Sequence, residues 1–326
     1  MALGTPAFPN FCKSYAVDLH ITRVGARLIA KGEGRRTMTN PTRLRSLLFA
    51  PGDSERKAAK AAASAADGII LGLEDSVAPP GKDAARAMVA ALLPTLARPG
   101  VIVRVNPRGT PWYLADLAAV IPCRPFAILL PKCTGPHDLH ALDHHLEALE
   151  AAHGLPHGSI GVLALVTETA ASLLRMDYLG APSRLLALCF GAEDLSADLG
   201  VSPRDPDGRY AGPVSAARAL TITAAAAAGV PALDTPWPDP RDPTGLATET
   251  ARAARDGFAG KLCIHPDQVA AVNAAFTPSA ERVAWARQVQ DGFAARPGAG
   301  VFALDGKMID RPHLRLAERI LAASRS

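Results

Sequence analysis

The chain has 326 residues, of which 48% are hydrophobic and 20% are charged, and its formal net charge is +4. This length suits one large domain with short additions, and this composition excludes disorder for most of the chain. The small net charge, without basic runs interleaved with aromatic residues, argues against nucleic acid as a partner. No apolar stretch approaches about 18 residues, so we expect no membrane span.

The first residues of the chain lack a clear hydrophobic periodicity. They carry several basic side chains but no continuous apolar segment, so a secretory signal is not expected. We predict a disordered extension over residues 1–40, a catalytic domain over residues 41–276 and a C-terminal extension over residues 277–326.

Past residue 44, short apolar runs alternate with alanine-rich helical stretches. The runs lack period-2 alternation and are rich in Val, Ile and Leu, as is typical of parallel strands buried on both faces. The predicted strands cover residues 45–51, 68–75, 101–106, 127–132, 160–168, 184–191, 230–235 and 261–266. Segments between them, such as 55–66, 82–97 and 213–228, are long enough for crossover helices.

Eight consecutive strand–helix units predict an α/β fold, the TIM (β/α)8 barrel, in which the active site forms at the carboxyl ends of the strands. Polar residues gather at that end of the predicted strands. They are Glu74, Asp75, Arg104, Asn106, Lys132, Glu168, Asp194 and His265. An open doubly wound sheet would also produce alternating strands and helices, but it would bind its ligand at one switch point rather than across most strands.

The C-terminal extension over residues 277–326 is too short to fold alone. It contains a helix that Ser279 is expected to cap, a hairpin signal at Asp305–Gly306 and a final helix after Pro312. We predict that it packs on the barrel or on a neighbouring subunit.

The five cysteines lie far apart, at Cys12, Cys123, Cys133, Cys189 and Cys263. They form no C-x-x-C pair, so neither a disulfide framework nor a zinc site is indicated. We therefore expect reduced thiols in a cytoplasmic protein.

Two acids end neighbouring predicted strands. Glu168 and Asp194 could share an oxygen-preferring ion such as Mg²⁺, which binds one or two protein carboxylates and keeps waters for the substrate. Taken alone, each acid would also serve as the cap of the helix that follows it. Arg104 lies among apolar neighbours, so its guanidinium needs an anionic partner, either Glu74 or Asp75 of the preceding strand or a substrate oxygen.

Lysines and histidines allow different chemistry. Lys132 and Lys261 stand at strand ends, where a desolvated amine can form a Schiff base, although pairing with an acid at the mouth explains them too. We expect Lys132 to contact the substrate. His140 and His144 share one face of a predicted helix, but the segment lacks the Glu of the H-E-x-x-H zinc motif, so a solvated face is favoured.

From Arg45 to about Ala323, the chain resembles the citrate lyase beta-chain branch of the HpcH/HpaI aldolase family. The matching motifs, in the order that the family has them, are LLFAPGD, LEDSV, VRVN, LPK, VTETA, FGAEDL, GKLCIHPDQV, FTPSAERVAWA and DGKMIDRP. The resemblance implies a TIM barrel that makes or breaks a carbon–carbon bond beside a carbonyl with help from Mg²⁺. Gly72 departs from the family, which usually has Asp there, and leaves room rather than charge.

When the residue roles of the family are carried over position by position, the resemblance implies that Glu168 and Asp194 are the metal ligands. The acidic pair of Glu74 and its neighbour Asp75 would support the metal's water shell and the arginine at position 104, which would face the reacting oxygens. In the branch that acts on malyl-type thioesters, an aspartate like Asp310 comes from a neighbouring subunit as the proton-transfer residue. That implies a homo-oligomer, commonly a trimer.

The expected function is reversible cleavage of a 3-hydroxyacyl-CoA or acyl-carrier thioester, of the malyl, citramalyl or citryl type, into a 2-oxo acid and an acyl thioester. The same site would also suit hydrolysis of the thioester. The sequence is further compatible with a Schiff-base aldolase that uses Lys132 and with a non-catalytic subunit of a lyase complex. It does not fix the acyl group, the choice between free CoA and an acyl carrier, or the number of subunits.

Overall fold

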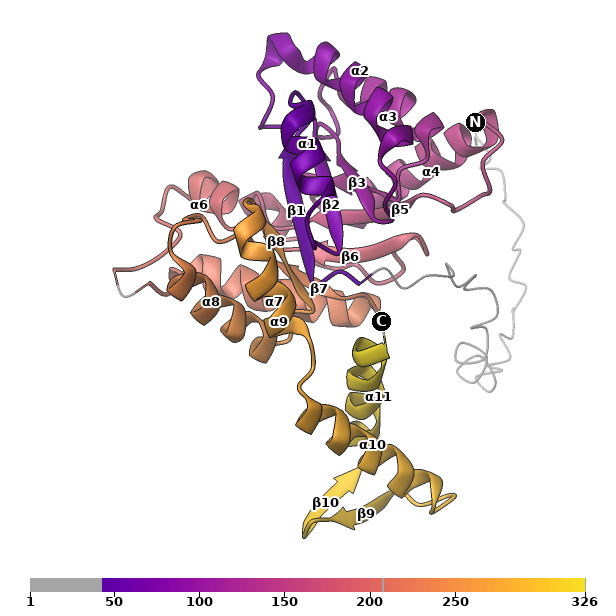
Figure 1. Cartoon of the computed structure of the whole chain (residues 1–326), viewed down its shortest axis with the longest axis vertical. Coiled ribbons are helices and arrows are strands. Elements are labelled where there is room, and N and C mark those ends of the chain that lie inside the picture. Colours follow the sequence, from indigo (N-terminus) through magenta and orange to yellow (C-terminus); the bar gives the residue numbers. More distant parts are fainter. Residues whose placement is uncertain (1–42, 207, 326) are drawn as a thin grey trace, which may run out of the picture. The chain divides into compact units, whose positions relative to one another are not determined.

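The computed structural model describes residues 43–206 and 208–325, which form a closed eight-stranded barrel and a C-terminal extension (Figure 1). Strands that follow each other along the chain pair in parallel, and the last one closes the ring on the first. The predicted TIM barrel is therefore confirmed. The predicted N-terminal extension, residues 1–40, lies outside the described residues.

The barrel strands are β1 (Ser46–Pro51), β2 (Gly68–Gly72), β3 (Val101–Arg104), β4 (Ala127–Leu130), β5 (Gly161–Leu165), β6 (Leu185–Cys189), β7 (Ala232–Asp234) and β8 (Gly260–Cys263). The helices around them are α1 (Glu55–Ala62), α2 (Lys82–Leu92), α3 (Tyr113–Val120), α4 (Pro136–Ala152), α5 (Ala170–Leu173), α6 (Glu193–Leu199), α7 (Gly212–Ala228), α8 (Pro243–Asp256) and α9 (Val269–Phe276). Short 3-10 turns cover Pro79–Gly81, Leu93–Thr95, Ile121–Cys123 and Pro266–Gln268.

All eight predicted strands are present, but each of them is shorter than the apolar run that predicted it. The second run extends to residue 75, whereas β2 ends at Gly72, and the fifth extends to residue 168, whereas β5 ends at Leu165. Leu73 and Val166, just beyond these ends, remain buried. The chain therefore stays buried beyond the last residues that pair in the sheet. An apolar run marks the buried residues, not the end of the strand.

The strands bury side chains on both faces. Side chains that face the barrel interior form one apolar cluster, and those that face the helices form a larger one. On β3, Ile102 belongs to the inner cluster and Val103 to the outer one. Because side chains alternate along a strand, the next inward position is Arg104, at the carboxyl end of the barrel.

The C-terminal extension contains α10 (Ala280–Ala294), β9 (Val301–Leu304), β10 (Lys307–Asp310) and α11 (Arg311–Arg325). The side chain of Ser279 caps α10, as predicted. Asp305 and Gly306 join the two strands with φ values of 51° and 75°, a left-handed turn that these residue types favour. The extension buries an apolar cluster of its own. Its boundary at residue 277 and its packing on a neighbour stay predictions.

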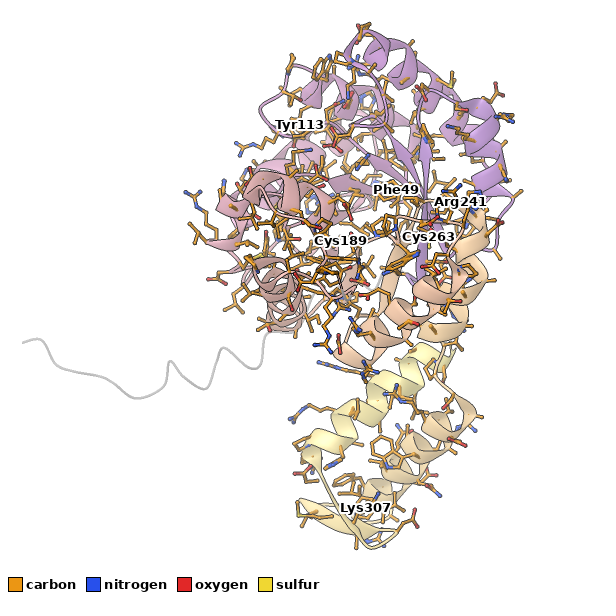
Figure 2. The ribbon with its side chains drawn as sticks, turned by 90° about the vertical axis from the view of Figure 1, so that its left-hand side faces the viewer. Phe49, Tyr113, Cys189, Arg241, Cys263 and Lys307 are labelled. Atoms are coloured by element: carbon orange, nitrogen blue, oxygen red, sulfur yellow. The ribbon has the colours of Figure 1, made fainter. Side chains whose placement is uncertain are left out.

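In the described part of the chain, no helix is both long and apolar enough to cross a membrane. The four described cysteines are free, and Cys189 and Cys263 are buried (Figure 2). His140 and His144 are exposed on α4, as expected for a solvated face. Cys12 lies outside the described residues.

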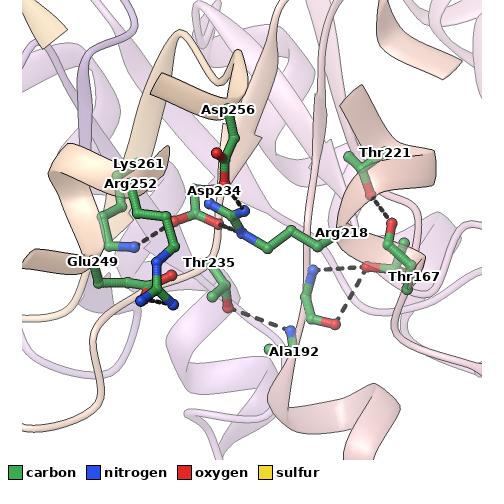
Figure 3. Close-up of polar contacts among 12 residues, drawn as sticks. Thr167, Ala192, Arg218, Thr221, Asp234, Thr235, Glu249, Arg252, Asp256 and Lys261 are labelled. Atoms are coloured by element: carbon green, nitrogen blue, oxygen red, sulfur yellow. Dashed lines mark hydrogen bonds and ion pairs between the residues drawn. The ribbon is translucent and has the colours of Figure 1, made fainter. Parts of the chain in front are cut away.

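A buried network of charges joins β7 and β8 to the helices outside them (Figure 3). Lys261 Nζ lies 2.6 Å from Asp234 Oδ2, and both side chains are fully buried. Arg218 of α7 lies 3.4 Å from Asp234 and 2.6 Å from Asp256 of α8. The next residue of β8, Leu262, faces the barrel interior, so Lys261 faces the helices. The interpretation of Lys261 as an amine at the mouth is therefore wrong.

Replacing Lys261 with Met should lower the free energy of unfolding by about 3 kcal/mol or more, because Asp234 would remain buried with one cationic partner fewer. Urea denaturation measures the change. The control is Lys57→Met on the exposed side of α1, for which we expect a change below about 0.5 kcal/mol. Equal unfolding midpoints for the two variants would contradict the prediction.

Candidate active site

A cavity of about 330 Å³ opens at the carboxyl ends of the barrel strands. Its walls come from seven of the eight strands or the segments that follow them, including Phe49 of β1 and Thr235 after β7. Three residues predicted from the sequence line it, namely Arg104, Glu168 and Asp194. These residues are far apart along the chain, and the barrel brings them to one hollow at the end where TIM-barrel sites form.

Glu168 is held by an unusual backbone conformation at Lys132. Its side chain is almost fully buried, and its Oε2 accepts a hydrogen bond of 2.5 Å from the backbone N–H of Lys132. Lys132 has a φ of 50°, a left-handed conformation that is uncommon and costly for a residue with a side chain. The surrounding contacts maintain this strain, and the strained amide points at Glu168.

Gly191 leaves the space that Glu168 occupies. A Cβ at position 191 would lie 2.8 Å from Glu168 Cγ, which is closer than real contacts allow. The adjacent Thr167 hydroxyl accepts from the Gly191 N–H at 2.9 Å and donates to its carbonyl at 3.3 Å (Figure 3). The N–H of Ala192 in turn donates to Thr235 Oγ1 at 3.3 Å. The chain segments after β5, β6 and β7 are thus fixed to one another.

Asp194 lies in the first turn of α6, with 40% of its side chain exposed. The cap position of α6 is Ala192, and α5 is capped by the side chain of Thr169. The interpretation of Glu168 and Asp194 as helix caps is therefore wrong. Both carboxyl groups line the cavity, and Lys132 Nζ lies 3.6 Å from Asp194 Oδ1.

Glu74 is buried and pairs with two cations. Arg104 Nη1 lies 3.0 Å from its Oε2, and Lys132 Nζ lies 2.5 Å from its Oε1. Asp75 is more exposed and lies 3.2 Å from the same ammonium group. The expected pairing of Arg104 with an acid of the preceding strand is confirmed for Glu74, and the ammonium group of Lys132 contacts three carboxylates.

The clustered acids and their burial shift the pKa values of Glu168 and Lys132. Burial, together with the charge of Glu74, raises the pKa of Glu168 to about 8, although the hydrogen bond from Lys132 opposes the shift. Burial lowers the pKa of Lys132, but its hydrogen bond and ion pair with Glu74 outweigh this effect, so the net pKa is above its usual range. A lysine that holds its proton so firmly is a poor nucleophile, which disfavours a Schiff base.

The charge balance of the site suits a divalent cation. When all four acids described above are ionised, they outnumber the cationic side chains of Arg104 and Lys132 by two, and a bound cation would favour the ionised form of Glu168. Within residues 43–206 and 208–325, no three His, Cys, Asp or Glu side chains are grouped as a metal site. An ion between Glu168 and Asp194 would therefore keep water or substrate oxygens as its remaining ligands, which is the coordination that Mg²⁺ prefers.

Two residues that position the site were assigned no role from the sequence. The ammonium group of Lys82 is buried and donates to the Glu74 carbonyl at 3.0 Å and to Asn106 Oδ1 at 2.7 Å. The ring of Phe49 lies beneath Arg104, with 4.8 Å between its centroid and the guanidinium carbon. Side-chain alternation along β1 would have predicted that Phe49 faces inward, whereas a lysine in the first turn of a helix carries no signal of burial.

The position of Gly72 offers less room than its residue type suggested. A Cβ there would lie 2.9 Å from Ser76 Oγ and 3.8 Å from Arg104 Nη2. The hydroxyl of Ser76 thus occupies the space beside the guanidinium in which a side chain at position 72 would start. An acid at this position would require Ser76 to shift.

Asp310 is not among the residues that line the cavity. It ends β10, where its Oδ1 lies 2.6 Å from His313 Nδ1, and this hydrogen bond lowers the pKa of Asp310. Within the described chain, the structure records no contact between Asp310 and the rest of the predicted site residues. Its role therefore stays a prediction.

Known proteins resemble this chain over most of its length. The sequence profile of the HpcH/HpaI aldolase/citrate lyase family matches residues 45–266. A citrate lyase subunit beta-like protein of Mycobacterium tuberculosis is 39% identical over 276 residues, which cover 84% of this chain and 93% of the relative. A (3S)-malyl-CoA thioesterase of Cereibacter sphaeroides is 36% identical over 282 residues, which cover 85% of this chain and 93% of the relative.

A solved structure shares the fold. The crystal structure of the CitE protein from Mycobacterium tuberculosis, in complex with magnesium, acetoacetate and coenzyme A, superimposes with a TM-score of 0.68 and 34% sequence identity. The match covers 86% of this chain and 98% of that chain. The similarity therefore extends beyond the barrel core to most of both proteins.

Gly191→Ala should weaken Mg²⁺ binding about tenfold or more, because the added methyl group would displace Glu168, and misplaced ligands commonly cost this much metal affinity. Isothermal titration calorimetry with Mg²⁺ measures the change. The matched control is Gly212→Ala at the start of α7, where a Cβ would meet nothing within 4 Å. Equal Mg²⁺ affinities in the two variants would show that the ion does not depend on Glu168.

Proposed function

The chain belongs to the HpcH/HpaI aldolase/citrate lyase family, and we propose that it reversibly cleaves a 3-hydroxyacyl thioester into a 2-oxo acid and an acyl thioester. The proposed substrates are malyl, citramalyl or citryl thioesters of CoA or of an acyl carrier. The observation that carries the proposal is the convergence of Glu168, Asp194 and Arg104 on one cavity at the barrel mouth.

Glu168 and Asp194 would hold Mg²⁺. Their carboxylates line one cavity, their surroundings carry excess negative charge, and similar proteins were crystallised with magnesium. When bound, the ion would act as a Lewis acid and a template for the hydroxyl and carboxylate oxygens of the substrate. Lys132 would keep Glu74, Asp75 and Asp194 in position and contact the substrate at the exposed side of its ammonium group.

Arg104 would stabilise the negative charge that develops on the thioester oxygen as the carbon–carbon bond breaks. Its guanidinium is fixed by Glu74 and by the ring of Phe49, and it lines the cavity. A donor that is oriented before the reaction stabilises developing charge without reorganisation. Asp310 of a neighbouring subunit would then donate a proton to the enolate carbon of the acyl fragment, and this proton balances the one that the substrate hydroxyl loses.

Hydrolysis of the thioester is the second candidate function, because a relative that is 36% identical is named (3S)-malyl-CoA thioesterase. The two reactions differ in their products. Cleavage of the carbon–carbon bond releases an oxo acid, namely a 2-oxo acid from malyl and citramalyl thioesters and a 3-oxo acid from the 3-hydroxy-3-methylglutaryl thioester, whereas hydrolysis releases a free thiol. An assay that measures both products from malyl-, citramalyl- and 3-hydroxy-3-methylglutaryl-CoA, with and without Mg²⁺, separates them.

Glu168→Gln should remove Mg²⁺ binding and lower turnover by about 10²-fold or more, because it deletes one of two charged ligands. Release of the 2-oxo acid measures turnover, and calorimetry measures binding of Mg²⁺. Glu147→Gln, at a half-exposed position of α4, is the matched control and should retain full activity. Undiminished turnover in Glu168→Gln, with a substrate that the unmodified protein cleaves, would overturn the proposed role of this residue.

Co-expression tests whether Asp310 serves a neighbouring subunit. Chains with Arg104→Ala and chains with Asp310→Asn should each be inactive, but mixed oligomers should recover up to about a quarter of full activity, since complementary copies restore some sites. The control is a mixture of Arg104→Ala chains and Glu168→Gln chains. It should recover no activity, because every chain would then carry a change in its own barrel site. No recovery in the first mixture, with mixed oligomers present, would place the action of Asp310 within its own chain.

A further inference from the structure

Among the described residues, one hydroxyl group of the cavity at the barrel mouth has no strong partner. Two residues that line this cavity carry a hydroxyl group, namely Ser76 and Thr235. Thr235 is buried, and its Oγ1 accepts a hydrogen bond from the Ala192 N–H. Ser76 is exposed, and the bond that its Oγ donates to the Gly72 carbonyl is 3.4 Å long. Hydroxyl donors normally lie within about 3.0 Å of an oxygen acceptor, so this proton is available to another acceptor.

The guanidinium group of Arg104 also keeps donors that no acceptor occupies. Its Nη1 lies 3.0 Å from Glu74 Oε2, whereas its Nε is buried and has no acceptor among the described residues. An arginine carries five N–H donors in a fixed planar arrangement, so the pair with Glu74 leaves donors for a second anion. Arg104 lines the cavity, which is where such an anion would reach it.

Gly72 leaves a space that both groups border. A Cβ at this position would lie 2.9 Å from Ser76 Oγ and 3.8 Å from Arg104 Nη2. Gly72 pairs with Arg104 in the barrel sheet, and its φ is not positive, so its backbone conformation does not itself require glycine. The missing side chain therefore leaves room in which one oxygen, or the two oxygens of a carboxylate, can contact both donors.

We propose that the Ser76 hydroxyl is a second hydrogen-bond donor to the substrate oxygen that Arg104 stabilises. This inference rests on the proposed function, in which that oxygen belongs to the thioester. As the carbon–carbon bond breaks, its electron pair passes to the acyl fragment and the thioester oxygen gains negative charge. Ser76 keeps its own proton throughout this step. Two donors that are oriented before the reaction stabilise this charge more than one does.

Malate and 2-hydroxybutyrate are probes that isolate this subsite. Malate is the acid that remains when a malyl thioester loses its thiol, so a carboxylate oxygen takes the place of the thioester oxygen. In 2-hydroxybutyrate the same 2-hydroxy acid group is present, but a methyl group replaces the distal carboxylate. Both probes offer the same oxygens to Mg²⁺, so the difference between their affinities measures the contacts of the distal carboxylate.

Calorimetry with the full chain and saturating Mg²⁺ measures both affinities. Ser76→Ala should weaken malate binding about tenfold, since it removes a hydrogen bond to a charged group, and it should leave the affinity for 2-hydroxybutyrate unchanged. With a thioester substrate, it should lower kcat and kcat/KM by the same factor, about tenfold or more, because the donor acts on charge that develops in the transition state. Ser215→Ala, at an exposed position of α7, is the matched control and should change none of these values.

A double-mutant cycle with Gly72→Ala tests the geometry. The added methyl group would collide with Ser76 Oγ and turn it away, so Gly72→Ala alone should weaken malate binding about as much as Ser76→Ala does. In a chain that already carries Ser76→Ala, the oxygen is absent, and Gly72→Ala should cause little further loss. Additive losses would show that the two positions act independently and would contradict the shared subsite.

Failure of this inference differs from failure of the proposed function. Unchanged malate affinity in Ser76→Ala, an equal loss for 2-hydroxybutyrate, or no binding of malate to the unmodified protein would overturn the inference. A preference for malate that depends on Ser76, without cleavage of any thioester, would reject the lyase and keep the subsite. Cleavage of a thioester with kinetics and malate affinity that Ser76→Ala leaves unchanged would reject the subsite and keep the lyase.

Discussion

The site depends on Lys132, which links acids that come from different strands. Its backbone N–H donates to Glu168 after β5, and its ammonium group contacts Glu74 after β2 and Asp194 after β6. Carboxylates this close repel one another, and burial increases the cost of their charge. One lysine in a strained conformation cannot neutralise them all. The site is therefore arranged around a charge deficit, which a bound cation would remove.

The barrel makes this crowding of acids possible because its strands supply the stability of the fold, whereas the segments that follow the strands carry the acids. Its strands fill both faces with aliphatic side chains, so stability does not require polar contacts inside the ring. Where charges are buried elsewhere, as for Asp234 between Lys261 and Arg218, they are matched by cations. The carboxyl end of the ring is thus the part of the barrel where unbalanced charge is maintained.

The sequence predicted the barrel, its strands and the hairpin, because continuous apolar runs and turn residues depend on local chemistry. It also predicted that Arg104 pairs with an acid of the neighbouring strand, since a buried guanidinium requires an anion and few anions lie within its reach. It did not predict the left-handed backbone of Lys132 or the space beside Gly191, which arise only when separate strands meet. Lys261 was misplaced because its position at a strand was considered without counting the alternation from Leu262, which directs it outward.

The hydrogen bonds that join Thr167 to Gly191 and Ala192 to Thr235 restrict which parts of the mouth can diverge. Segments that are hydrogen-bonded to one another in this way cannot lengthen or reorient one at a time without breaking the bonds to their neighbours. Variation in the size of the acyl group accepted by related enzymes would therefore require concerted changes in these three segments. The rim after β5, β6 and β7 would then change as a unit or not at all.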